Sequence, residues 1–207
     1  LVDAIGTPVH IMRVSTARSV ELIANAKSRG LPITASTTWM HLLLDSLAIE
    51  GKSLLDNYFF PYDPNLRLEP PLGSQSDRLT LLEGIRDGVL DAIAIDHAPY
   101  TYEEKTVAFS EAPTGAIGLQ IALPLLWQSF VNTGQMSALE LWRVLSTSPS
   151  KCLGLIPGDI RPQKSAEVTL FAPQETWVVE KQTLKSRSFN TPWLGKQIQG
   201  RVLEWEF

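Results

Sequence analysis

The sequence predicts an α/β fold in which parallel strands alternate with helices, and three observations support this prediction. Short apolar runs with strand-like composition alternate with stretches in which apolar residues recur at helical spacing. Each strand and its following helix occupy about 30 residues, which is typical of a parallel crossover unit. Beyond residue 157 the pattern changes to short β-rich runs separated by turns. We therefore expect an α/β part, residues 1–157, and a small β part, residues 158–207.

Four strands are expected in the α/β part. The first, residues 7–15, is an apolar run that begins at Thr7-Pro8. The other three are expected at residues 31–36, 65–69 and 92–95. Four parallel strands make half of an eight-stranded barrel. Because an open half-barrel leaves two unpaired edges, we expect these edges to be covered by another half-barrel or by a second copy of the chain.

The expected helices have recognisable ends. Residues 16–29 stop at Gly30, and Ser76-Asp77 can cap a helix that ends near Gly88. Ser137 and Glu140 stand at the spacing of a capping box. Helical spacing assigns four residues of the late helices to the core, namely Trp127, Leu139, Trp142 and Leu145. The expected helices are residues 16–29, a stretch from about 41, and residues 77–88, 117–132 and 137–147.

The two ends of the chain give further expectations. Residues 1–6 have the pattern of the last turn of a helix and carry no initiator methionine, so we expect a fragment or a processing product. At the other end, residues 167–171, 176–180 and 198–207 have strand composition, and we expect a small β-sandwich module there.

The composition argues against several classes of partner. The chain has 207 residues, 18 Lys+Arg and 22 Asp+Glu, a net charge of −4 and no basic stripe, so nucleic acid is not an expected partner. No apolar run approaches the roughly 18 residues of a membrane helix, so no membrane association is expected. The single cysteine, Cys152, excludes an intramolecular disulfide and suits a reducing cytoplasm, where we expect the protein to lie.

The motif "IDHAP", residues 95–99, places Asp96 at the end of an expected strand. Asp96 is either a catalytic carboxylate or a structural one that caps the loop or pairs with a cation such as Arg13. Together with other segments, this motif resembles the C-terminal half of class I dihydroorotases, within the amidohydrolase superfamily. The other segments are "VHIMRVSTARSVELIANAKSRG", "ITASTTWMHLLL", "LRLEPPLGSQSDR", "APTGAIGLQIALPLL", "AEVTLFAP" and "NTPWLGKQIQGRV".

The resemblance implies a fold and an activity. The fold would be the second half of a (β/α)8 TIM-type barrel, followed by part of a β-sandwich that both chain termini build. The activity would be the reversible hydrolysis of dihydroorotate to carbamoyl aspartate in pyrimidine biosynthesis. In that family zinc polarises the amide carbonyl and activates a bound water. The resemblance assigns metal ligation and proton transfer to Asp96.

Two other metal-ligand positions of the family hold different residues here. The family places a histidine before "VST" and another within a Pro-His-His sequence, where this chain has Arg13 and Met40. A guanidinium has no lone pair to donate and is permanently charged. A thioether is a soft ligand, poorly suited to zinc among oxygen and nitrogen donors. We therefore expect Asp96 to be the only retained ligand and zinc to be absent or weakly bound.

The positions that face the substrate in the family have also changed. Glu69 replaces an asparagine and would oppose a dianionic substrate, Gly73 replaces an arginine, and Tyr100 replaces a histidine. Thr114 and Gly115 match the place where the family brings its backbone to the substrate, although a loop that ends at a helix start explains them equally well.

The remaining polar residues favour structural roles. We expect His97 to hydrogen-bond within its loop, His41 to be satisfied at a helix start, and His10 to pack between the barrel and its helices. The charges of residues 100–105 are expected to be solvated; Lys105 matches a common lysine of the family without an assigned role.

Three functions remain open. The first is a dihydroorotase-like protein that is catalytically impaired or inactive. The second is an active zinc dihydroorotase, or a related cyclic amidohydrolase, in its complete form. The third is a non-catalytic structural partner of aspartate transcarbamoylase. In each case we expect either the N-terminal half of the barrel or a second copy to be bound.

Overall fold

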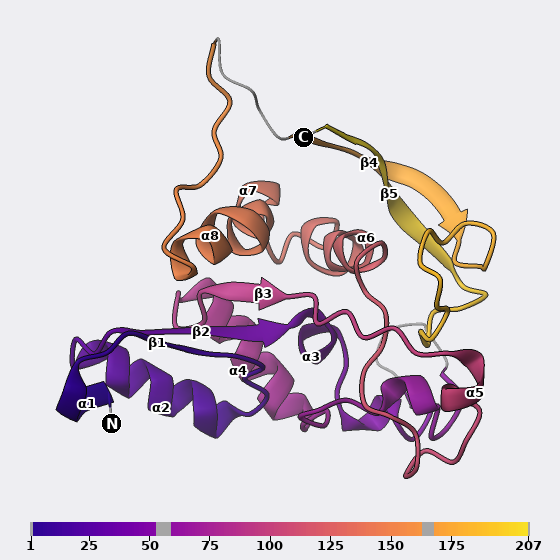
Figure 1. Ribbon diagram of the computed structural model, residues 1–207, viewed down its shortest axis with the longest axis horizontal. Helices are drawn as coiled ribbons and strands as arrows, with labels where there is room; N and C mark the ends of the chain where they lie inside the picture. The colour runs from indigo at the N-terminus through magenta and orange to yellow at the C-terminus, as the bar shows by residue number, and fades with distance from the viewer. Residues whose placement is uncertain (1, 53–58, 163–167, 207) are drawn as a thin grey trace.

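The computed structural model describes residues 2–52, 59–162 and 168–206, and it has a three-stranded parallel sheet at its centre (Figure 1). Strand β2 lies between β1 and β3, with Val9 opposite Ile33 and Ser36 opposite Ala92. The parallel pairing confirms the predicted α/β class. The strands are β1 Val9–Ile11, β2 Ile33–Thr38 and β3 Ala92–Ala94.

The expected strand at residues 65–69 is wrong. Residues Pro64–Leu66 form a 3-10 helix instead. Pro64 has no backbone N–H for a sheet ladder, and the side chain of Asp63 accepts a hydrogen bond from the N–H of Asn65. Local turn chemistry therefore prevails over the short apolar pattern.

Helices flank the sheet on two sides in the view of Figure 1, with α2 and α4 below it and α6, α7 and α8 above it. The helix expected at 117–132 begins later, at Ala122, and the one expected at 137–147 is present; each continues into a π-helical turn, Trp127–Val131 and Arg143–Thr147. No helix in the described ranges is long and apolar enough to cross a membrane. The α-helices are α1 Val2–Ile5, α2 Ala17–Ser28, α3 Trp39–Leu43, α4 Gln75–Arg86, α5 Tyr102–Lys105, α6 Ala122–Leu126, α7 Ala138–Trp142 and α8 Ser148–Cys152.

Helix α4 begins two residues earlier than expected, at the N-cap Ser74. Asp77 completes a capping box, because its Oδ2 accepts from the Ser74 N–H at 2.9 Å. Its Oδ1 accepts from the N–H of Ala17 at 2.8 Å, which ties α4 to the start of α2. Gly73 leaves room for this arrangement, since a Cβ there would lie 2.9 Å from the Asp77 Cβ. At Ser137 and Glu140 the predicted capping box is confirmed.

The β part contains an antiparallel ribbon of β4 Val168–Val178 and β5 Gln197–Glu206. The expected runs at 167–171 and 176–180 join into the single strand β4; residues 167 and 207 lie outside the described residues. The ribbon packs against α6, and Trp177 donates from Nε1 to the carbonyl of Gly200 at 2.8 Å. A sandwich requires a second sheet, so the sandwich stays a prediction.

Aromatic side chains join the two parts of the chain. Trp39, next to β2, and Trp193, before β5, are each 1% exposed, and their rings are in contact with centroids 5.1 Å apart and planes tilted by 34°. Trp127 and Trp142 both contact the ring of Phe171 on β4. Trp127 is partly buried against the core, as expected, whereas Trp142 is only partly buried and contacts the rings of Trp127 and Phe171.

One core assignment is wrong. Leu139 is 79% exposed, whereas Leu141 is fully buried. The capped first turn of α7 directs Leu139 outward, and the helical period then brings Leu141 to the core side. Leu145 is partly buried against the core, as expected.

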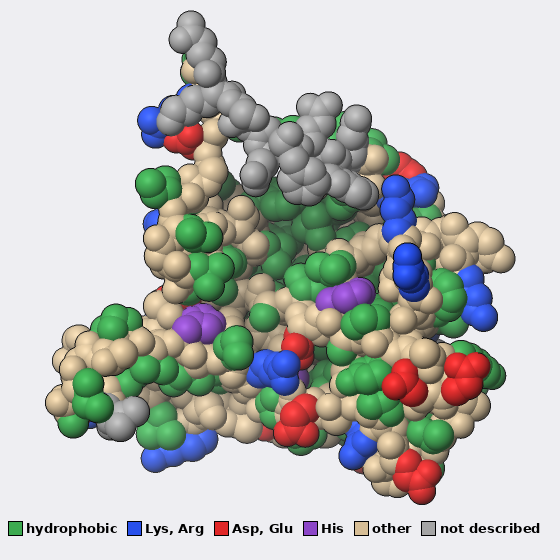
Figure 2. All heavy atoms as spheres, viewed as in Figure 1, with side chains coloured by type: hydrophobic (Ala, Val, Ile, Leu, Met, Phe, Trp, Pro, Cys, Tyr) green, Lys and Arg blue, Asp and Glu red, His purple; other side chains and the backbone are tan. Residues whose placement is uncertain are grey.

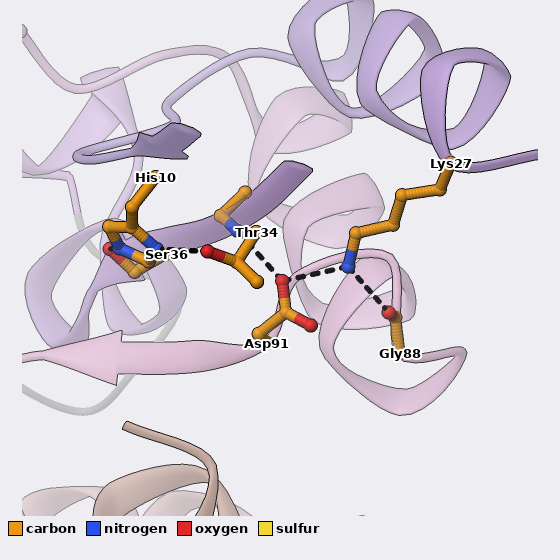
Figure 3. Close-up of polar contacts among 7 residues, drawn as sticks. His10, Lys27, Thr34, Ser36, Gly88 and Asp91 are labelled. Atoms are coloured by element: carbon orange, nitrogen blue, oxygen red, sulfur yellow. Dashed lines mark hydrogen bonds and ion pairs between the residues drawn. The ribbon is translucent and has the colours of Figure 1, made fainter. Parts of the chain in front are cut away.

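Polar contacts fix the register of the sheet (Figure 3). Asp91 Oδ2 accepts from Lys27 Nζ and from the N–H of Ala35, both at 2.7 Å. His10 is exposed, and its Nδ1 and Nε2 contact the hydroxyls of Thr34 and Ser36 at 2.8 and 3.0 Å. The expected packing of His10 against helices is therefore wrong, because parallel pairing places its ring over the hydroxyl-bearing face of β2.

We expect Ser74→Ala to lower the free energy of unfolding by about 1 kcal/mol, because the N-cap acceptor of α4 is lost. Urea denaturation followed by circular dichroism measures this change. The control is Ser110→Ala, at an exposed turn position. Equal stability of the two variants would contradict the assigned cap.

Candidate functional site

Asp96 and Arg13 meet at the edge of the sheet where the strands end. Asp96 follows β3 and Arg13 follows β1, and the Arg13 Nη2 lies 2.9 Å from the Asp96 Oδ1. Both residues have left-handed backbone conformations, with φ of 48° and 56° respectively. The two chain segments leave their strands through these turns, and the side chains pair across the end of β2. The cation pairing that the sequence allowed for Asp96 is therefore present.

Arg13 has a second contact on the same edge. Its Nη1 donates to the backbone carbonyl of Glu69 at 3.3 Å. The Arg13 and Asp96 side chains are 43% and 32% exposed, so the pair is open to solvent. An ion pair with this exposure adds little stability. Its main effect is that the guanidinium compensates the negative charge of the Asp96 carboxylate. Figure 2 shows acidic and basic side chains adjoining one another on this face.

Met40 and His41 lie on the short helix α3 directly after β2. Met40 is 3% exposed and belongs to the hydrophobic core. His41 is 2% exposed; its Nε2 is 3.1 Å from the carbonyl of Pro70 and its Nδ1 is 2.7 Å from the Thr38 hydroxyl. The carbonyl can only accept, so Nε2 carries the proton and Nδ1 accepts from Thr38. Its burial and its two hydrogen bonds confirm the expected structural role, and burial also lowers the pKa of His41.

His97 forms its hydrogen bonds with residues just after its loop, ahead of α6, and not within the loop as expected. Its Nδ1 accepts hydrogen bonds from the N–H groups of Gly118 and Leu119, at 3.0 and 3.4 Å. Both partners are donors, so Nδ1 is unprotonated, and burial lowers the pKa of the ring. The ring borders a pocket of about 660 Å³ between the start of α6 and the β4–β5 ribbon.

Tyr100 and Gly115 are held by backbone contacts that link distant loops. The Tyr100 N–H donates to Asn190 Oδ1 at 3.1 Å, and the Gly115 N–H donates to the Arg67 carbonyl at 2.7 Å. Gly115 has a φ of 116°, and a Cβ there would lie 2.5 Å from the Ala98 Cβ. Glycine is therefore required for loop packing, whatever its role toward a substrate. Thr114, beside it, is half-buried.

Two residues of this region have roles that sequence reasoning missed. Asn190 is 5% exposed and also donates to the carbonyl of Ala98 at 2.9 Å, so it fixes the loop that follows Asp96. Its position at the start of "NTPWLGKQIQGRV" was the only signal for it. Lys105 was expected to be solvated, but it is 8% exposed. Its long aliphatic stem allows the amine to reach carbonyls beneath the loop.

The described side chains around Asp96 do not form a set of metal donors. Within the described ranges, no group of three or more His, Cys, Asp and Glu side chains is placed to hold one. Asp96 is paired with a guanidinium, Met40 is in the core, and both ring nitrogens of His41 are engaged. These residues, as arranged, do not fit a binuclear zinc site.

We expect the free energy of unfolding to fall as the pH drops below about 6.5, the ordinary pKa of histidine. The unfolded chain binds protons there that His41 and His97, with lowered pKa values, do not bind in the folded state. His41→Gln should weaken the pH dependence of the unfolding free energy by the equivalent of about one bound proton. Urea denaturation at several pH values measures this. His10→Gln, at the exposed histidine, is the control; an unchanged slope in His41→Gln would show that His41 titrates normally.

Comparison with known proteins agrees with the resemblance seen in the sequence. Residues 5–198 match the amidohydrolase family. A probable dihydroorotase-like protein of Synechocystis sp. is 50% identical over 201 residues, covering 97% of this chain and 44% of that protein. A dihydroorotase of Bacillus licheniformis is 39% identical over 195 residues, covering 94% of this chain and 43% of that protein. The chain thus spans less than half the length of these curated relatives.

Solved structures show the same fold at lower identity. L-hydantoinase from Arthrobacter aurescens superposes with a TM-score of 0.85 at 22% identity, covering 99% of this chain and 44% of that one. The inactive dihydroorotase-like domain of a Chaetomium thermophilum CAD-like multifunctional protein gives a TM-score of 0.69 at 19% identity, covering 99% and 51%. These matches indicate a TIM-barrel-type fold. The family match over residues 5–198 establishes that the chain belongs to the amidohydrolase family, whose members are generally metal-dependent.

Proposed function

We propose that this chain is part of a dihydroorotase-like protein of pyrimidine biosynthesis, acting in the cytoplasm, that has lost the family's hydrolysis of dihydroorotate. The observation that carries the proposal is the 2.9 Å ion pair between Arg13 and Asp96. The likeness to a dihydroorotase-like protein at 50% identity supports the family assignment. The proposed barrel half is residues 1–157, and the proposed sandwich portion is residues 158–207.

Charge explains why this pair would oppose metal binding. A zinc ion at Asp96 would have to displace the guanidinium, which is permanently charged and 2.9 Å from the carboxylate. If the guanidinium stayed nearby, it would repel the dication. In either case the affinity for zinc is lower than for a carboxylate without a cation partner.

Met40 would remove a second donor. Its thioether lies in the core, 3% exposed, and zinc prefers nitrogen, oxygen and thiolate donors. His41, next to it, is committed to Thr38 and Pro70. The substrate-side changes also weigh against the family's activity. Tyr100 replaces a histidine of the family, and Glu69 is an exposed carboxylate that disfavours binding of a dianion.

The second candidate is an active zinc dihydroorotase, or a related cyclic amidohydrolase, in a longer polypeptide that contains this chain. The 39% identity to a protein named dihydroorotase favours it. Here Asp96 would keep its role as ligand and proton carrier. Arg13 would then have to move away from Asp96 when the metal binds.

The third candidate is a structural partner of aspartate transcarbamoylase. A fold match to a domain named inactive and dihydroorotase-like, within a CAD-like multifunctional protein, favours this non-catalytic role.

In each candidate we propose that a further half-barrel or a second copy covers the outer edge of β1. At this edge Ile11 and Met12 are 37% and 69% exposed.

We expect the natural polypeptide that contains these residues to lack stoichiometric zinc and dihydroorotate hydrolysis. The double substitution Arg13→His with Met40→His should raise the zinc content to at least one ion per chain, because two neutral nitrogen donors join Asp96. Metal analysis after dialysis measures this, and the hydrolysis assay is run on the same samples.

The matched control is Arg18→His with Met136→His, which changes one exposed arginine and one buried methionine elsewhere. Adding Asp96→Asn to the first pair should remove the zinc again. Stoichiometric zinc with turnover in the unmodified protein would refute the inactive assignment and support the active enzyme.

We expect the 22.9 kDa chain to sediment as a complex, with a second copy or with a separate half-barrel. Exposed apolar residues at the open edge of a parallel sheet favour association. Sedimentation velocity at several concentrations tests this. A monodisperse 22.9 kDa species throughout would contradict the proposed pairing.

A further inference from the structure

Lys105 is a buried cation in the loop that follows Asp96. It ends helix α5 and is 8% exposed. Its Nζ donates to the carbonyl of Pro113 at 2.6 Å and to that of Pro64 at 3.0 Å. The same nitrogen lies 5.1 Å from the ring centroid of Tyr100. One amine therefore contacts both ends of its own loop and the separate segment at residue 64.

Other contacts join the same two segments. The Arg67 guanidinium donates to the carbonyl of Ala112, and the Arg67 carbonyl accepts from the N–H of Gly115. The rings of Tyr62 and Phe109 meet edge to face with centroids 6.0 Å apart. The segment 62–67 is thus the platform against which the loop 98–115 closes. Lys105 lies at the buried centre of this contact.

The ammonium has no carboxylate within 4.0 Å in the part of the chain that the structure describes. Asp63 and Glu104 act on it from a greater distance and favour its charge, while Arg67 disfavours it; the ring of Tyr100 also faces it. Burying a cation without a counter-ion is costly. Burial accordingly lowers the pKa of Lys105 to about 8.

We propose that Lys105 is a positioning residue and a proton-controlled latch: its amine holds Tyr100 and residues 112–115 against the platform 62–67, and proton uptake by the amine favours opening of the loop. This inference goes beyond the proposed function and does not depend on it, because no metal and no reaction enters it.

The direction of the pH effect follows from proton linkage. In an open loop the solvated amine keeps its ordinary pKa of 10.5, and in the closed loop the pKa is about 8. Between these values the open form binds more protons, so rising pH favours closure and falling pH favours opening. A neutral amine still has two N–H groups, which match the carbonyls of Pro64 and Pro113.

Limited proteolysis of the loop 98–115 by subtilisin measures opening in the intact chain between pH 7 and 10. Each cleavage rate is divided by the rate for a synthetic peptide of the same loop sequence, which removes the pH dependence of the protease. We expect the normalised rate to fall above pH 8, toward a limit of about tenfold per pH unit. Nuclear magnetic resonance of Lys105 in chains with labelled lysine reads its titration directly.

Two variants separate the latch from a merely structural role. Lys105→Met should abolish the pH dependence, and Lys105→Arg, charged throughout this range, should keep the loop readily cleaved at every pH. Lys151→Met, at an exposed position, should behave as the unmodified chain. An unchanged pH dependence in Lys105→Met, or a Lys105 titration near pH 10.5 in the folded chain, would overturn the proposal.

Discussion

Parallel pairing of β1, β2 and β3 is the constraint on which the rest of the structure depends. It brings the carboxyl ends of three strands to one edge, so that Arg13, Thr38 and Asp96 come together although they are far apart in the sequence. The helix after β2 then places Trp39 over the same edge, where its Nε1 donates to the carbonyl of Ile95 at 2.9 Å. A shift of register would separate the ion pair from the residues around it.

Positive charge at this edge is supplied by the chain itself. A guanidinium neutralises Asp96, and a buried ammonium lies behind the loop that follows it. The imidazoles of His41 and His97 act as neutral hydrogen-bonding groups, because desolvation lowers the pKa of each ring. The arrangement suits a scaffold in which hydrogen bonds of these groups maintain loop geometry. It offers few free donors to an added cation.

Local signals in the sequence predicted local structure well. The alternating pattern predicted parallel α/β units, the capping box at Ser137 is present, and His41 is satisfied at a helix start. Predictions that needed knowledge of distant neighbours were less successful. Leu139, His10 and Lys105 were misplaced, because their environment depends on how a helix is rotated, on which strand lies alongside, and on which carbonyls lie under a loop. The strand at 65–69 was wrong because turn chemistry outweighed a short apolar run.

The sequence by itself determined the α/β class and the family, since these follow from periodicity and from motifs read in order. Only the tertiary structure decided that Arg13 contacts Asp96 at 2.9 Å, that Asn190 and Lys105 donate hydrogen bonds to the loop after Asp96, and that Gly115 is required for packing. The physical reason is that side-chain contacts between residues tens of positions apart depend on strand order and backbone turns. No local pattern in the sequence encodes those distances.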